Sequence, residues 1–64
     1  MELNRSIIDT NIKLLMKSLQ KEFDNLSKEQ ENKLNYNLLR KRLRIISDIS
    51  NEITKLVKKA QSIS

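Results

Sequence analysis

The chain has 64 residues, a formal net charge of +5, and no Cys, His, Gly or Pro. These absences exclude disulfides and argue against a structural zinc site. A core of this size rarely supplies more than about 3–5 kcal/mol, so we expect an oligomer or a large partner to add stability. With only one Tyr and one Phe, the composition predicts a single all-α domain over residues 1–64.

Net positive charge is confined to the second half of the chain. Residues 1–32 carry five cations and six acids, a net of −1, whereas residues 33–64 carry eight cations and two acids, a net of +6. This imbalance favours contact between the second half and a polyanion. The alternative is a basic surface that only faces solvent, and charge alone does not separate the two.

Neither a membrane segment nor a targeting segment is visible. The apolar runs are short, and the pattern of a signal peptide is absent. The lack of Cys fits a reducing, intracellular compartment. There is also no His, no Cys and no Gly-rich phosphate loop, so we expect no catalytic residue, cofactor, metal or small-molecule substrate, and we do not expect an enzyme.

The first helix is predicted over residues 7–24. Ser6 and Asp9 have the spacing of a capping box at its start. Apolar residues then recur every three or four positions, which places them on one face of a helix. The predicted apolar face comprises Ile8, Ile12, Leu15, Leu19, Phe23 and Leu26.

A turn is predicted at residues 25–27, because Asn25 tolerates the left-handed conformation that ends many helices. Ser27 and Gln30 then have capping-box spacing for a second helix over residues 28–60. So short a connection predicts an antiparallel hairpin with a short first helix, a long second helix and coiled-coil-like packing. The rival is one uninterrupted helix that assembles into an oligomeric coiled coil.

The second predicted helix has an apolar seam. From Ile46 to Ile63 the apolar spacings alternate between three and four residues, which is the pattern of a heptad repeat. This seam should pack against the apolar face of the first helix. The residues predicted to pack in the hairpin are Leu15, Leu19, Phe23, Leu39, Ile46, Ile49, Ile53 and Leu56.

Cations of the second helix form a stripe opposite its seam. Turning about 100° per residue puts the stripe and the seam on opposite sides of the helix. Arg42 is the exception, since it points near the seam, where it could meet an acid from the first helix. No aromatic residues interleave with the cations, so phosphate contact is favoured over base stacking. The stripe consists of Lys33, Arg40, Arg44, Lys55 and Lys58, with Lys41 and Lys59 beside it.

The layout resembles a family of small large-subunit ribosomal proteins, numbered twenty-nine in the universal scheme. Residues 23–26, Phe-Asp-Asn-Leu, are similar to the segment that closes the first helix of that family. Residues 39–49, Leu-Arg-Lys-Arg-Leu-Arg-Ile-Ile-Ser-Asp-Ile, lie over the mixed basic and apolar pattern of its second helix. Arg42 and Leu43 stand where the family has an apolar and then a basic residue. Asp48 stands in place of an arginine, and the usual turn glycine is missing.

The resemblance implies a structural protein on the ribosome that binds ribosomal RNA near the exit of the peptide tunnel. It implies a neighbouring ribosomal protein as a second partner and no catalytic part. It also implies RNA contacts for Arg40, Lys41 and Arg44, to which the helical positions alone add Lys33 and Lys55.

The alternative hypothesis is a protein-interaction subunit with no nucleic acid, either a homo-oligomeric helical bundle or a coiled-coil part of a larger complex. Its partners would be other helices. Ile46, Ile49 and Ile53 would then hold the partner, and the cations would only keep the protein soluble.

Overall fold

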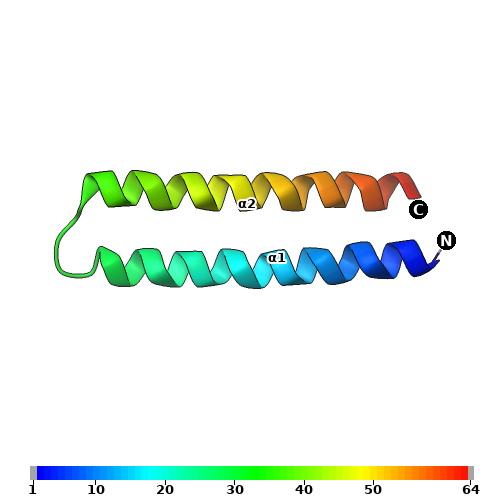
Figure 1. Cartoon of the computed structure of the whole chain (residues 1–64), viewed down its shortest axis with the longest axis horizontal. Helices are drawn as coiled ribbons and strands as arrows, with labels where there is room; N and C mark the ends of the chain where they lie inside the picture. Colours follow the sequence, from blue (N-terminus) through cyan, green and yellow to red (C-terminus); the bar gives the residue numbers. More distant parts are fainter. Residues whose placement is uncertain (1, 64) are drawn as a thin grey trace.

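In the computed structural model the chain forms two antiparallel α-helices joined by a short loop (Figure 1). α1 spans Glu2–Glu29 and α2 spans Tyr36–Ile63, and each helix has 28 residues. The structure describes residues 2–63, with side chains from Arg5 onwards. The start of α1 and the end of α2 lie together at one end of the molecule, and the loop lies at the other. The predicted all-α hairpin is confirmed.

The helix boundaries differ from the prediction. Residues 25–27, expected to form the turn, lie inside α1, and the loop is residues 30–35. The predicted short first helix (residues 7–24) and long second helix (residues 28–60) are therefore replaced by two helices of equal length. Because the two helices are equally long, a turn of α1 lies beside every turn of α2, and the whole apolar seam of α2 packs against α1. Tertiary packing of this kind contributes more to helix stability than local capping signals do.

The loop is closed by two polar side chains. Asn35 is the N-cap of α2, because its Oδ1 accepts a hydrogen bond from the Leu38 N–H at 3.1 Å and its carbonyl accepts one from the Leu39 N–H at 2.9 Å. Gln30 Oε1 accepts from the Asn35 N–H at 2.7 Å. The Gln30 N–H donates to the Leu26 carbonyl at 3.1 Å, which ends α1.

Asn35→Ala is expected to lower the free energy of unfolding by about 1 kcal/mol, because the first turn of α2 loses the acceptor that satisfies the Leu38 N–H. Urea unfolding followed by circular dichroism measures this change. Asn37→Ala is the control, since Asn37 is exposed and its side chain makes no hydrogen bond within residues 5–63. Equal losses for the two variants would contradict the assignment of Asn35 as the cap.

One heptad seam joins the helices, with steps that alternate between three and four residues. Its most buried members are Ile8, 7% exposed, and Ile46, 9% exposed. The other members are half-buried, and two of the seam positions on α1 and one on α2 carry charges. The seam consists of Ile8, Ile12, Leu15, Leu19, Glu22, Leu26 and Glu29 on α1, and of Leu39, Arg42, Ile46, Ile49, Ile53, Leu56 and Ala60 on α2.

Phe23, predicted for the seam, lies outside it and is 48% exposed, while Glu22 takes the seam position. Strict alternation of the steps leads from Leu19 to Glu22, and only this alternation keeps one face toward a supercoiled partner. A carboxylate is tolerated there because α2 presents Arg42 to the same part of the seam.

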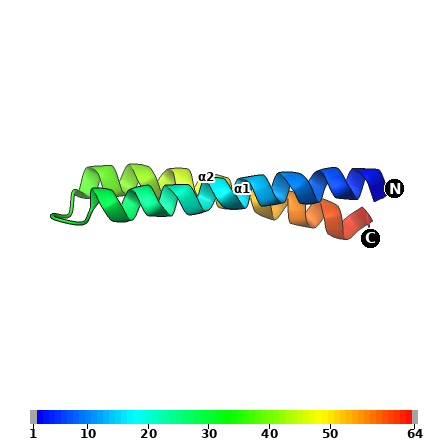
Figure 2. The same cartoon turned by 90° about the horizontal axis from the view of Figure 1, so that it is seen from below.

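The hairpin is long and thin, and its helices cross at a shallow angle (Figure 2). Its radius of gyration is 14.9 Å, whereas about 11 Å is expected for a compact chain of this length. Its accessible surface is 5494 Å², against about 4300 Å² for a globular protein of this mass. Within the described residues, neither helix is apolar enough over a sufficient length to span a membrane. The large accessible area indicates that two helices alone leave much apolar surface in contact with water.

Candidate nucleic-acid interface

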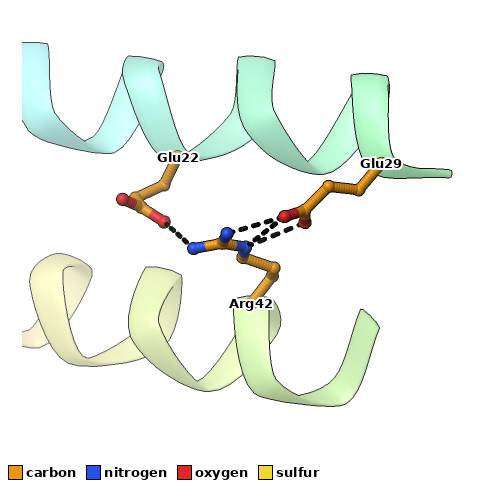
Figure 3. A network of polar contacts seen from close by, with 3 residues as sticks. All are labelled: Glu22, Glu29 and Arg42. Carbon is orange, nitrogen blue, oxygen red and sulfur yellow. Dashed lines mark hydrogen bonds and ion pairs between the residues drawn. The ribbon is translucent and has the colours of Figure 1, made fainter. Parts of the chain in front are cut away.

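Arg42 reaches from α2 to α1, where it lies between Glu22 and Glu29 (Figure 3). Its Nε donates to Glu29 Oε1 at 2.8 Å and to Oε2 at 3.0 Å, and its Nη2 donates to Oε2 at 2.6 Å. Its Nη1 lies 3.4 Å from Glu22 Oε1. All three side chains are half-buried. Arg42 thus meets acids of the first helix and is occupied within the fold, so it is not available to a nucleic acid.

This cluster sets the charge of its members. The hydrogen bonds from Arg42 hold the pKa of Glu29 below its ordinary value, against the opposing effect of desolvation. The hydrogen bond to Glu29 is also the main reason that the pKa of Arg42 is raised. Because the pKa of Glu29 is lowered by folding, the pair contributes its full stability above the ordinary carboxyl pKa of 4.5. That contribution is lost as the pH falls through the lowered value.

Glu29→Gln is expected to reduce stability at neutral pH and to flatten the further loss of stability on acidification below about pH 4.5. Urea titrations at a series of pH values measure both effects. Glu52→Gln is the matched control, because Glu52 pairs with Lys55 at 3.4 Å on the exposed side of α2 and exposed pairs contribute little. The same flattening in both variants would contradict a special role for Glu29.

In the first half of α2, three exposed cations have no partner within the described residues. Arg40, Lys41 and Arg44 are exposed and take part in no ion pair or hydrogen bond there. Together with Asn37 they line a shallow groove of about 420 Å³. Arg40 and Arg44 lie one helical turn apart, and like charges at this spacing weaken a helix slightly. An anion in the groove would remove that repulsion.

The other two predicted RNA-binding residues are not part of this groove. Lys33 lies in the loop and not on α2, so its predicted alignment with the helical stripe is not realised. It lines a separate open hollow of about 600 Å³ at the loop end, which shares only Asn37 with the groove. Lys55 lies on α2, about 16 Å from Arg44 along the helix axis, and pairs with Glu52. The structure thus brings together Arg40, Lys41 and Arg44 and separates Lys33 and Lys55 from them.

The sequence predicts that Arg42 could meet an acid of the first helix, but it does not identify which acid. The structure shows that the acids are Glu22 and Glu29, which both lie in the seam of α1. The signal that could have revealed them is their separation of seven residues, one heptad.

Asp48 follows Arg44 by one turn on α2 and is exposed. Its carboxylate would repel phosphate, and the groove residues all precede it. Among the described residues, no cluster of three or more acidic side chains is arranged to hold a metal ion.

Fold and charge together define a small helical hairpin with a cationic outer edge on α2. No family model matches the sequence, and comparisons with curated proteins and with solved structures returned no match.

Proposed function

We propose that this protein is a structural RNA-binding subunit, which holds RNA phosphates in the groove on the outer edge of α2. The observation that carries the proposal is the group of three exposed, unpaired cations around one groove, Arg40, Lys41 and Arg44. Guanidinium groups donate planar pairs of hydrogen bonds that match phosphate oxygens. The amide of Asn37 adds a neutral donor and acceptor for phosphate or sugar.

The expected mode of binding is contact with the RNA backbone. Phe23 and Tyr36, the aromatic residues of the chain, do not line the groove, so stacking on unpaired bases has no platform there. The groove is shallow and open, which suits a duplex or a folded RNA whose phosphates lie on its surface. Binding should therefore tolerate changes in sequence and depend strongly on salt.

Within this class, we propose the large ribosomal subunit as the site of action, with ribosomal RNA and a neighbouring ribosomal protein as partners. The support is the resemblance of residues 39–49 to the basic helix of the ribosomal family, because the three cations that it selects, Arg40, Lys41 and Arg44, line one groove. The proposed location is accordingly the ribosome, of the cytoplasm or of an organelle.

The residues that were suggested to hold a partner in the alternative, protein-interaction hypothesis are already used within the hairpin. Ile46 is 9% exposed, and Ile49 and Ile53 are half-buried in the seam between α1 and α2. These side chains hold the hairpin itself together, so a partner helix would have to use a different surface.

The test of the proposal is the double substitution Arg40→Gln with Arg44→Gln. Binding to folded ribosomal RNA should weaken by roughly ten- to a hundredfold at physiological salt, since two charge-assisted contacts are removed. Incorporation into large ribosomal subunits in cells should fall in parallel. Unchanged binding and unchanged incorporation would overturn the proposal.

A further inference from the structure

Four apolar side chains that the seam does not use lie on one face of the hairpin. On α1, Met16 is 55% exposed and Phe23 is 48% exposed; on α2, Leu43 is 47% exposed and Val57 is 38% exposed. Each of the four comes directly after a seam residue, and those seam residues all occupy the same position of the heptad repeat. In an antiparallel pair, the positions that follow equivalent seam residues lie on the same face, because reversing one helix also reverses the sense in which its residues turn. We call these four residues the apolar face.

The residues beside the apolar face are almost all uncharged. Only three residues on that side of the hairpin carry charge: Asp9, Lys13 and Arg40. The other positions there are small or amide side chains, and the Thr54 hydroxyl already donates to the Ser50 carbonyl at 3.0 Å, which lowers the cost of removing it from water. The uncharged neighbours are Ser6, Gln20, Ser27, Gln30, Ser47, Ser50, Thr54 and Gln61.

The opposite face has a different character. Ile7 of α1 and Lys59 of α2 line one hollow on that side, which shows that the two helices contribute to it jointly. The opposite face also exposes Ile7, Leu14 and Ile45, but seven charged residues lie among them. Protein interfaces are depleted in charge and enriched in aromatic residues and Met, so the apolar face is closer to an interface in composition than the opposite face is. The charged residues of the opposite face are Lys21, Lys28, Lys41, Asp48, Glu52, Lys55 and Lys59.

We propose that a second copy of this chain covers the apolar face, so that two hairpins form an antiparallel four-helix bundle. The spacing of the face supports this occupant. Met16 and Phe23 are centred between residues 19 and 20, and Leu43 and Val57 are centred on Ser50. Because Arg42 lies between Glu22 and Glu29, these two centres lie within about 3 Å of each other along the hairpin.

A twofold axis across the hairpin at this level makes the face self-complementary. It places Phe23 of one copy over Met16 of the second copy, and Leu43 over Val57. Every helix then has antiparallel neighbours, as in up-and-down bundles.

The charged residues also fit this arrangement. The same axis places Asp9 over Gln30 of the second copy, Lys13 near Ser27, and Arg40 near Gln61. No like charges meet, and each charge lies near an uncharged polar residue of the second copy.

The exposed area of the hairpin leaves room for a dimer interface. The hairpin exposes 5494 Å², roughly 1200 Å² more than the globular expectation of about 4300 Å². A standard interface removes about 800 Å² from each partner, so dimerisation would bring the exposed area of each copy closer to the globular expectation. Lys41 and Arg44 remain outside the contact, so a dimer would present two cationic edges. The inference does not depend on RNA binding by those edges.

Sedimentation of the purified, nucleic-acid-free chain over a wide range of concentration tests the proposal. The wild type should sediment as a dimer. Phe23→Glu with Leu43→Glu should weaken association by more than roughly a hundredfold, because charges would be buried without partners. The matched control is Leu14→Glu with Ile45→Glu on the opposite face, where the side chains are 56% and 39% exposed. It should change association by less than roughly threefold.

A cross-link makes the test independent of how well these variants fold. Ser50 lies on the proposed axis and the natural chain has no Cys, so Ser50→Cys should oxidise readily to a covalent dimer. Ser18→Cys, on the opposite face, should not. The proposal is overturned if the wild-type chain stays monomeric at every concentration, even if it binds a different protein. Equal loss of association in the two double variants, or equal cross-linking at the two cysteines, overturns it too.

Discussion

Ile46→Ala is expected to unfold most of the isolated chain. Ile46 is one of only two buried hydrophobic residues in the described part of the chain, the other being Ile8. Truncation of a buried Ile to Ala costs about 2–5 kcal/mol, because burial is lost and a cavity remains. A single core in a chain this small supplies about 3–5 kcal/mol in total. The loss is thus comparable with the whole stability, and the helical circular dichroism signal at neutral pH should collapse.

The neighbouring substitution Ile45→Ala provides the control for Ile46→Ala. Ile45 is 39% exposed, and Ala has the higher intrinsic helix propensity, so stability should change by about 1 kcal/mol at most. Urea titrations at low protein concentration compare the two variants without a contribution from association. Similar losses at the two positions would contradict the seam and would point to a helix pairing in another register.

The second large effect is expected in the salt dependence of RNA binding. Each phosphate contact contributes roughly 0.7–0.9 to the slope of log affinity against log salt concentration, because a bound counterion is released. Arg40→Gln with Arg44→Gln should therefore reduce the magnitude of that slope by roughly 1.5 as well as weaken binding. Titrations of a folded RNA at several salt concentrations measure both quantities.

Substitution of two cations on α1 is a control that distinguishes RNA contact in the groove from general electrostatic attraction of RNA to the protein. Lys13→Gln with Lys17→Gln removes the same amount of charge from exposed positions outside the groove. This control should lower affinity only slightly and leave the slope nearly unchanged. If both double variants reduced the slope equally, RNA would be attracted by net charge, and the groove would have no special role.

The Arg42 cluster also gives the hairpin a single register. A heptad seam of Ile and Leu would fit nearly as well after α1 slipped by seven residues along α2. After such a slip Arg42 would face only one of the two carboxylates, Glu22 or Glu29, that it now reaches. A partly buried charge that loses a partner is costly, so the cluster selects one alignment. The same alignment leaves Lys41 and Arg44 of the groove outside the apolar face and places Arg40 at the border between the two.

The sequence by itself determined the fold class and most of the surface of α2. Its lack of Gly and Pro, together with helical apolar spacing, is sufficient for an all-α chain, but it leaves open whether the chain forms a hairpin or one continuous helix. The heptad spacing from Ile46 onward defines the seam of α2, and a turn of 100° per residue places Arg40 and Arg44 on the outside. The same count turns Arg42 toward the first helix. These features follow from local geometry, which does not depend on what the helix packs against.

Only the tertiary structure decided where α1 ends and which of its residues face α2. Asn25 and Ser27 are acceptable both as a turn and as helix, and the local preferences are small beside the gain from covering the far end of α2. Phe23 and Glu22 are both compatible with helical spacing after Leu19. The choice of Glu22 depends on Arg42, twenty residues later in the chain. A charged side chain becomes a seam residue only when its partner is in place, and that partnership exists only in the folded hairpin.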